Sequence, residues 1–476
     1  MAASSPDTCS SCAYLAESPV IGNDGRAMQS KAGMTIISCA PDGAALQRAL
    51  NEVTTEKALL LLEDERRLTI DTAAIERLAR GFEDAAAAYG DYRRLRGDQI
   101  LENPTIAYSL GAIRDDFDFG PLVLISMKHV HLAEQPWGKL APTRWSSWYE
   151  LRLRLSRVGL VRRAAECTCT LRVGEIRDGH FDYVDPRNRL VQMEREAVAT
   201  EHLKAIGAWL PRRTARPMPV GVRTDSRTRM PVEASVIIPV RSRVRTIADA
   251  VRSALSQQAD FPFNVVVVDN HSTDGTSKLL DELAVKDRRL VVLRPARRDL
   301  QIGGCWNLAV ASPQCGRYAV QLDSDDLYSG DETLAMMVAK LREGPYAMVV
   351  GSYRLVDFDL HEIPPGVIDH REWSDTNGHN NLLRVNGIGA PRAFDTAVLR
   401  QHPMPDVSYG EDYAVALAIS RTYPVGRIYE PLYLCRRWEG NSDASPPLEL
   451  TNERNLYKDN LRTREIEARK AMVSSE

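Results

Sequence analysis

The sequence predicts an α/β protein whose second half is a mostly parallel sheet with helices on both faces. From residue 233 onward, short apolar segments with the composition of strands alternate with amphipathic segments of helical length. Between residues 211 and 232 the composition changes to Pro, Arg and Thr without an apolar period, which is typical of a linker. We therefore expect a smaller α/β domain before the linker and a larger one after it.

The overall composition limits the classes of protein to consider. The 476 residues exceed one ordinary hydrophobic core, so two or more domains are expected. The formal net charge of −3 provides no general positive field to attract nucleic acid. No stretch approaches about 18 uninterrupted apolar residues, and the first thirty residues lack the pattern of a signal peptide. We therefore expect a cytoplasmic protein with no transmembrane segment and no nucleic-acid partner.

The order of the expected elements suggests five segments. These are a flexible leader (1–33), an N-terminal domain (34–210), the linker (211–232), a catalytic domain (233–445) and a C-terminal helical tail (446–476). The strands expected before the linker are residues 34–39, 58–62, 121–126 and 160–173, and the helices are 43–53, 72–88 and 148–158. The strands expected after the linker are residues 234–240, 264–269, 290–293 and 318–322, and the helices are 244–257, 276–285 and 303–311.

Acidic residues follow two of the strands expected after the linker. Asp269 ends one strand, and Asp323, Asp325 and Asp326 come directly after another. In parallel α/β sheets, ligands bind outside the carboxyl ends of the strands. If the extended conformation persists beyond Leu322, Asp323 and Asp325 point to the same side and present oxygen ligands suited to a hard divalent ion. An acidic turn that caps the following helix is the alternative interpretation.

Five motifs in this half occur in a particular order. They are Val236-Ile-Ile-Pro239-Val240, Val267-Val-Asp269-Asn-His-Ser-Thr-Asp-Gly-Thr276, Gly303-Gly-Cys-Trp-Asn307, Leu322-Asp323-Ser324-Asp325-Asp326 and Gly410-Glu411-Asp412-Tyr413. Their order and spacing over residues 233–445 resemble those of the family 2 glycosyltransferases, which have the GT-A fold. The resemblance implies an inverting glycosyltransferase of hexosyltransferase type, which moves a sugar from a nucleotide sugar to an acceptor hydroxyl.

The resemblance also implies roles for individual residues. Asp323 and Asp325 correspond to the DxD element that holds Mn²⁺ or Mg²⁺ against the donor diphosphate, with Asp325 as the direct ligand. Asp412 corresponds to the general base, with Glu411 as its neighbour. Arg436 or Arg437 is expected to clamp the diphosphate. The other expected donor-binding residues are Pro239, Val240, Asp269, Asn307 and Ser324.

The donor nucleotide is expected to be UDP, because the Asp269 carboxylate can accept a hydrogen bond from a uracil-like N–H. The acceptor is left open among a glycan, a lipid-linked glycan, a protein and a small molecule, and a homo-oligomer is compatible with the sequence. Two alternatives remain. A nucleotidyltransferase also uses a doubly wound sheet and magnesium, but the segment after Pro239 lacks the glycines expected of that class. A catalytically inactive binding scaffold is the other alternative.

The first half of the chain resembles the second half in sequence. The stretch from Ala58 overlays on the stretch from Tyr318, which places Glu63 and Glu65 on Asp323 and Asp325. The stretch from Tyr149 overlays on that from Tyr413, so Ser147 and Trp148 fall on Glu411 and Asp412. Neither Ser147 nor Trp148 can act as a carboxylate base. We therefore expect a truncated, non-catalytic GT-A-like copy that serves acceptor binding, dimerisation or support.

Overall fold

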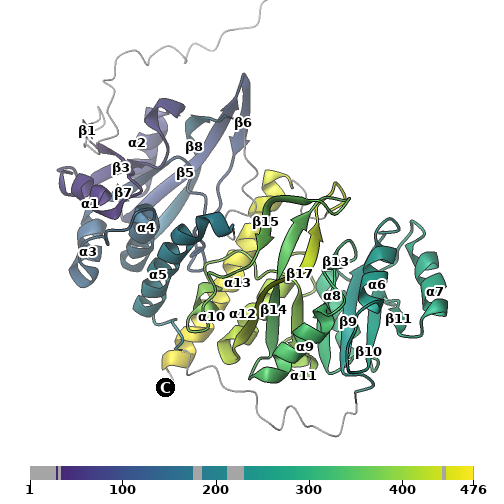
Figure 1. Ribbon diagram of the computed structural model, residues 1–476. Coiled ribbons are helices and arrows are strands. Elements are labelled where there is room, and N and C mark those ends of the chain that lie inside the picture. Colours follow the sequence, from purple (N-terminus) through teal and green to yellow (C-terminus); the bar gives the residue numbers. More distant parts are fainter. Residues whose placement is uncertain (1–27, 30–33, 175–184, 212–229, 442–445, 475–476) are drawn as a thin grey trace, which may run out of the picture.

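The chain folds into two mixed sheets that follow one another in sequence (Figure 1). The computed structural model describes residues 28–29, 34–174, 185–211, 230–441 and 446–474. The expected leader and linker lie largely outside these residues. Among the described residues, no helix is long and apolar enough to cross a membrane.

The first sheet has eight strands in the order β1-β2-β3-β7-β5-β8-β4, with β6 paired to β5. These strands are β1 (Met28–Gln29), β2 (Thr35–Ser38), β3 (Lys57–Leu61), β4 (Leu68–Ile70), β5 (Ala85–Arg96), β6 (Gln99–Asn103), β7 (Leu122–Ser126) and β8 (Leu160–Arg172). One face packs against α1 (Gly43–Asn51), α3 (Met127–Trp137) and α4 (Ser147–Val158), and the other against α2 (Thr72–Gly81). Helix α5 (Arg189–Ala205) follows the sheet.

The second sheet has nine strands in the order β11-β10-β9-β12-β16-β14-β17-β13, with β15 paired to β14. These strands are β9 (Ala234–Val240), β10 (Phe263–Asp269), β11 (Leu290–Leu293), β12 (Tyr318–Gln321), β13 (Leu327–Tyr328), β14 (Met348–Val356), β15 (Glu362–Ile368), β16 (Arg392–Asp395) and β17 (Val425–Arg436). The run from β11 to β12 is parallel, whereas β16 is antiparallel to both of its neighbours.

Helices cover both faces of the second sheet. The packed helices are α6 (Ile247–Leu255), α7 (Thr276–Lys286) and α9 (Thr333–Glu343) on one face, and α8 (Ile302–Ala311), α11 (Thr396–Gln401) and α12 (Glu411–Thr422) on the other. Burial on both faces explains why β10 reads as an unbroken apolar run instead of an alternating one. The predicted α/β class, with a smaller α/β domain before a larger one, is confirmed.

One expected helix is wrong in its second half. The segment 72–88 was expected to be helical throughout, but α2 ends at Gly81 and Ala85–Ala88 begin the buried strand β5. Alanine favours helices in isolation, whereas here small side chains pack between two neighbouring strands. Tertiary packing therefore overrides the local propensity.

The two sheets share one topology, which confirms the internal repeat. The order β2-β3-β7-β5-β8-β4 corresponds to β9-β12-β16-β14-β17-β13, and each corresponding pair of neighbours has the same direction. The side strands β6 and β15 also correspond, since β6 is antiparallel to β5 and β15 is antiparallel to β14, the counterpart of β5. The described residues of the first copy include no counterparts of β10 and β11, the two strands that border β9 on the side away from β12.

The strand register corrects the sequence overlay by one residue. Lys57 pairs with Ser126 just before α3, and Tyr318 pairs with Asp395 just before α11. Lys57 is therefore the counterpart of Tyr318, and Glu63 and Glu65 correspond to Ser324 and Asp326. Apolar strands of similar composition tolerate such a slip in a sequence overlay, although in three dimensions it moves every side chain to the opposite face.

Two equivalent positions meet at the interface between the copies. Tyr149 donates its hydroxyl hydrogen to the Ile113 carbonyl at 2.6 Å, and Tyr413 donates to the Leu382 carbonyl at 2.7 Å. Asp115 and Arg384, each two residues further along, form a buried ion pair of 2.6 Å with side chains 3% and 0% exposed. Contact between equivalent positions is the mark of an approximate two-fold axis, as in a symmetric dimer.

The last helix of each copy crosses to the other copy. Helix α13 (Leu448–Ser474) lies between the two sheets in Figure 1, and its Asp459 pairs with Arg114 of the first copy at 3.1 Å. Helix α5 contacts α10 (Gly378–Asn381) of the second copy, and Glu196 accepts a hydrogen bond from Asn377 at 2.7 Å. The two copies are therefore interlocked, as the subunits of a dimer with exchanged helices would be.

Removing Arg384 is expected to destabilise the fold strongly. The substitution Arg384→Met leaves the buried Asp115 carboxylate with only the more distant Arg195 at 3.3 Å, and should lower the free energy of unfolding by about 3 kcal/mol in urea titrations. The double variant Arg384→Met/Asp115→Leu should lose less than the sum of the single losses. Arg297→Met, in an exposed pair with Asp299, is the control and should change stability by less than about 0.5 kcal/mol. A loss at Arg384 no larger than this would contradict a structural role for the pair.

Candidate active site

A cavity of about 1300 Å³ opens at the carboxyl ends of β9 and β12. Its walls include Pro239 and Val240 from β9, Asp323 to Asp326 after β12, and Glu411 and Asp412 at the start of α12. Parts of the first copy and of α13 complete it on the far side. This position agrees with the general rule for ligand sites in parallel sheets.

The acidic segment after β12 is a turn, not an extension of the strand. The strand ends at Gln321, and the Asp326 N–H donates to the Asp323 carbonyl at 3.2 Å. The alternation of faces therefore stops, and the expectation that Asp323 and Asp325 share a side of an extended strand is wrong in its geometry. The turn nevertheless brings the carboxylates of Asp323, Asp325 and Asp326 to the same cavity.

The three turn carboxylates sit in different surroundings. Asp325 accepts hydrogen bonds from Trp438 at 3.2 Å and Asn441 at 3.1 Å. Burial raises the pKa of Asp323, and the nearby charge of Asp325 adds to the rise. Burial and the charges of Asp325 and Asp323 raise the pKa of Asp326 well above its ordinary value. Such crowding of buried oxygen donors fits a divalent cation, since a cation would offset the repulsion.

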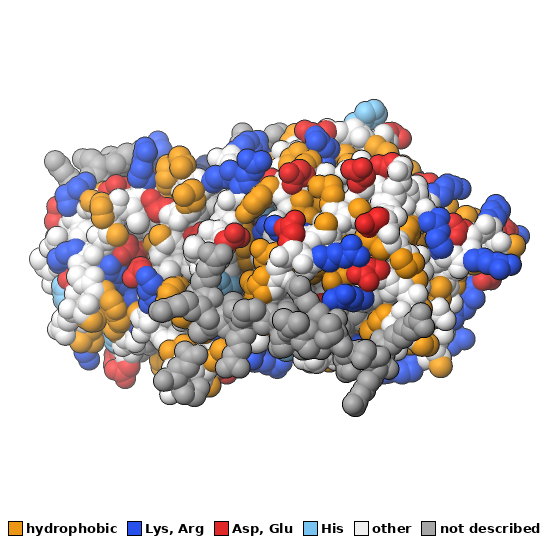
Figure 2. Space-filling view, turned by 60° about the horizontal axis from the view of Figure 1, so that its bottom comes forward, with side chains coloured by type: hydrophobic (Ala, Val, Ile, Leu, Met, Phe, Trp, Pro, Cys, Tyr) orange, Lys and Arg blue, Asp and Glu red, His pale blue; other side chains and the backbone are white. Residues whose placement is uncertain are grey.

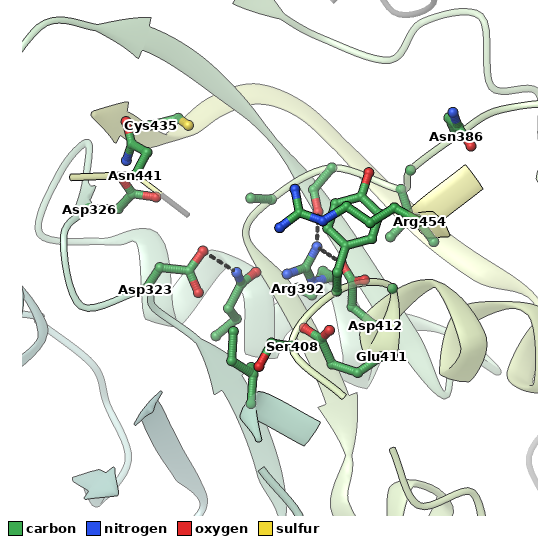
Figure 3. A pocket seen from close by; sticks show the side chains of 18 of the residues that line it. Asp323, Asp326, Asn386, Arg392, Ser408, Glu411, Asp412, Cys435, Asn441 and Arg454 are labelled. Atoms are coloured by element: carbon green, nitrogen blue, oxygen red, sulfur yellow. Dashed lines mark hydrogen bonds and ion pairs between the residues drawn. The ribbon is translucent and has the colours of Figure 1, made fainter. Parts of the chain in front are cut away.

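Glu411 and Asp412 lie across the cavity from the acidic turn, and their pKa values are shifted in opposite directions. Asp412 forms an ion pair of 2.5 Å with Arg392 at the start of β16 (Figure 3). Burial opposes ionisation of Asp412, but the charges of Arg392 and Lys458 outweigh it and hold the pKa below its ordinary value. Burial and the neighbouring Asp412 raise the pKa of Glu411 to about 8. Glu411 Oε2 is buried without a hydrogen-bond partner among the described residues.

Several of the sequence-predicted residues line the cavity and others do not. The predicted residues in its wall are Pro239, Val240, Asp323, Ser324, Asp325, Glu411, Asp412 and Arg437. Asp269, Asn307 and Arg436 are absent from the wall.

The three predicted residues outside the wall each support a loop that borders it. Asp269 is 1% exposed, and its carboxylate accepts hydrogen bonds from Ser272 and Ser277 after β10. Asn307 exchanges two hydrogen bonds with the backbone of Met404, ahead of α12. Arg436 is buried and donates to the Asp325 carbonyl at 2.7 Å, so it braces the acidic turn from behind. The direct ligand contacts predicted for these side chains are therefore not supported by their positions.

Arg392, Asn270 and Gln321 are wall residues that the sequence did not single out. The Oδ1 atom of Asn270 and the Oε1 atom of Gln321 are buried without partners among the described residues. Arg392 is separated from Asp412 along the chain, so no local motif links them. Comparison of the two copies does single out Arg392. The equivalent strand position of the first copy is the apolar Val123, so a charge at this position occurs in the second copy alone.

The matching region of the first copy is closed by packing. Trp148, the counterpart of Asp412, packs edge-on against Phe119 at 5.2 Å. Ser147, the counterpart of Glu411, donates a hydrogen bond to the Ala40 carbonyl. At these two positions of the first copy, a hydroxyl and an indole therefore stand in place of the two carboxylates, and both are engaged in contacts within that copy.

Residues 235–403 match the family model described as glycosyl transferase family 2. An uncharacterized glycosyltransferase of Rickettsia felis is 24% identical over 217 residues, which is 45% of this chain and 35% of that protein. One of Haemophilus influenzae is 23% identical over 230 residues, or 44% of this chain and 67% of that protein. The chain therefore spans about a third of the length of the Rickettsia relative.

Solved structures of glycosyltransferases are also similar. S. aureus TarS 1–349 in complex with UDP-GlcNAc is 21% identical in sequence and superposes with a TM-score of 0.39. The match covers 48% of this chain and 66% of the TarS chain. The mannosyltransferase PcManGT of Pyrobaculum calidifontis, in complex with GDP-Man and Mn²⁺, is 20% identical in sequence and superposes with a TM-score of 0.34. The match covers 59% of this chain and 83% of the PcManGT chain.

The raised pKa of Glu411 predicts a stability that depends on pH. Between the ordinary pKa of 4.5 and about 8, the folded state holds a proton that the unfolded state has lost, so stability falls as the pH rises through this window. Glu411→Gln removes this contribution, and the melting temperature of the variant should rise relative to wild type between pH 5 and pH 8.5. Asp326 and Asp323 also have raised pKa values, so part of the decline should remain. If the melting temperatures of the variant and of the wild type depended on pH in the same way, the raised pKa of Glu411 would be contradicted.

Proposed function

We propose that this protein, whose residues 235–403 match the family model described as glycosyl transferase family 2, is a nucleotide-sugar-dependent glycosyltransferase that inverts the anomeric centre. The observation that carries the proposal is the cavity in which two sets of carboxylates face each other. The acidic turn after β12 lies on one side, and Glu411 and Asp412 lie on the other, with Arg392 beside them (Figure 3).

The donor is proposed to occupy the side formed by β9, β10 and the acidic turn. Asp323 and Asp325 would hold Mn²⁺ or Mg²⁺, which neutralises charge on a leaving nucleoside diphosphate when it is bound. No group of three or more potential metal-ligating side chains occurs in the described part of the chain, so the remaining ligands would be phosphate oxygens and water. Arg437 lies in the same wall and supplies positive charge toward the diphosphate.

The nucleobase is proposed to be recognised by Asn270 instead of Asp269. The Asp269 carboxylate already accepts hydrogen bonds from Ser272 and Ser277, whereas Asn270 presents at the cavity wall a buried Oδ1 atom that has no partner in the described part of the chain. An amide oxygen accepts a hydrogen bond from an imide N–H such as that of uracil. UDP therefore stays the proposed nucleotide, with a different residue in the recognising role.

Asp412 is proposed as the general base. Its lowered pKa keeps it ionised near neutral pH, whereas Glu411 is largely protonated there and cannot accept a proton in that form. The acceptor hydroxyl would lose its proton to Asp412 as its oxygen bonds to the anomeric carbon. The bond from that carbon to the diphosphate breaks, and its electron pair leaves with the nucleotide. Attack from the face opposite the nucleotide inverts the anomeric centre.

Substitutions at the two sides of the cavity test this proposal. Asp325→Ala and Asp412→Asn should each reduce nucleotide release from UDP-sugars with Mn²⁺ by about 10²- to 10⁴-fold, the usual contribution of a general base or of charge stabilisation. Asp260→Asn, on an exposed side chain away from the cavity, is the control and should behave as wild type.

The outcomes distinguish the alternatives. An Asp412→Asn variant with wild-type turnover would rule out Asp412 as the base. Calorimetry that detects no metal-dependent binding of any nucleotide would instead identify the chain as an inactive scaffold. Release of pyrophosphate from a nucleoside triphosphate and a sugar phosphate would indicate a nucleotidyltransferase.

A further inference from the structure

The cavity is larger than one ligand requires. Its volume of about 1300 Å³ exceeds the range of about 300–1000 Å³ that is usual for a site holding one small molecule. In Figure 3 the acidic turn lies at one end, Glu411, Asp412 and Arg392 lie in the middle, and Asn386 and Arg454 lie at the other end. Space beyond the proposed base is therefore available for a second molecule.

The far end of the cavity is built from three parts of the chain. Asp116, Asn188, Gln192 and Arg195 come from the first copy, and Arg454 and Asn455 come from α13. The second copy adds Asn386, whose amide donates to Asp116 at 3.1 Å. The exchanged helices α5 and α13 therefore bring the catalytically silent copy to the active cavity.

Gln192 shows that this end is prepared for a ligand. Its side chain is 3% exposed, and its amide nitrogen donates to the Asp185 carbonyl at 2.9 Å, which fixes its orientation. Its Oε1 atom is buried and has no hydrogen-bond partner among the described residues. The Nε atom of Arg195, one helical turn further on, is likewise unpartnered among them. A buried polar atom left unsatisfied costs about 1–3 kcal/mol, which a ligand hydroxyl would recover.

We propose that α5 of the first copy and α13 form the acceptor subsite, and that the acceptor is a saccharide. This inference rests on the proposed glycosyltransferase function. Amide side chains both donate and accept hydrogen bonds, as sugar hydroxyls do, and Asn188, Gln192, Asn386 and Asn455 all line this end. A planar guanidinium such as that of Arg454 can bind adjacent hydroxyls with two parallel N–H groups.

The geometry of the interface explains why a silent copy serves this purpose. Arg195 pairs with Asp115 at 3.3 Å, and Asp115 pairs with Arg384 of the second copy at 2.6 Å. The buried ion pair that joins the copies therefore also positions a wall residue of the acceptor subsite. The first copy contributes its surface to the site without contributing a catalytic group.

Binding of simple glycosides tests the proposal. The probes are the methyl glycosides of glucose, galactose, mannose and N-acetylglucosamine, observed by saturation-transfer NMR with the full chain, with and without UDP and Mn²⁺. Gln192→Met keeps the length of the side chain but removes both polar atoms, and should weaken binding of the preferred glycoside at least 10-fold. UDP binding, measured by calorimetry, should not change, because Gln192 belongs to α5 of the first copy, whereas the proposed donor side is formed by β9, β10 and the acidic turn.

Two further variants complete the design. Met193→Gln places an amide on the neighbouring, 53% exposed position of α5 and should bind glycosides as wild type does. Asn455→Ala, on the opposite wall, should weaken glycoside binding even if Gln192→Met fails to fold. Wild-type affinity in both wall variants, or no glycoside binding by the wild type, would overturn the acceptor assignment. Absence of UDP binding with intact glycoside binding would instead count against the proposed donor.

Discussion

The buried ion pair between Asp115 and Arg384 is the contact on which the arrangement of the two copies depends. Both side chains are removed from solvent, and each charge there is stabilised by the other, with Arg195 as a second and more distant partner of Asp115. Their equivalent positions in the repeat place them near the approximate two-fold axis, where the two copies meet. Helices α5 and α13 also join the copies, because each extends from its own copy onto the other.

Electrostatic opposition organises the cavity itself. The acidic turn and the Glu411–Asp412 pair bring carboxylates to the walls of one cavity, where burial and mutual repulsion raise the pKa values of Asp323, Asp326 and Glu411. Arg392 forms an ion pair with Asp412 and lowers the pKa of that carboxyl. The pKa values of two adjacent acids are thus shifted in opposite directions, because Arg392 forms its ion pair with Asp412.

Much of the second sheet could be predicted from the sequence, because strands buried on both faces produce apolar runs that stop at polar ends. The acidic turn and the pair at the start of α12 were recognised for the same reason, since their residues are adjacent in sequence. Arg392 could not be found in this way, because its partner lies on another element and only the fold brings them together. The strand at Ala85–Ala88 was missed because its alanines favour a helix when neighbouring strands are ignored. The sequence assigns Asp269 and Arg436 to donor binding, whereas in the structure their side chains brace loops that border the cavity.

The covalent joining of two copies has a consequence for how such a molecule can diverge. In a homodimer, every substitution appears in both subunits, so a subunit cannot lose its own catalytic groups while its partner keeps them. A tandem chain removes this restraint, and Trp148 can replace a carboxylate in one half while Asp412 is retained in the other. Joining also makes the encounter of the halves intramolecular, so their association does not weaken on dilution. A single gene can therefore encode one half that keeps the carboxylates and another half that has lost them.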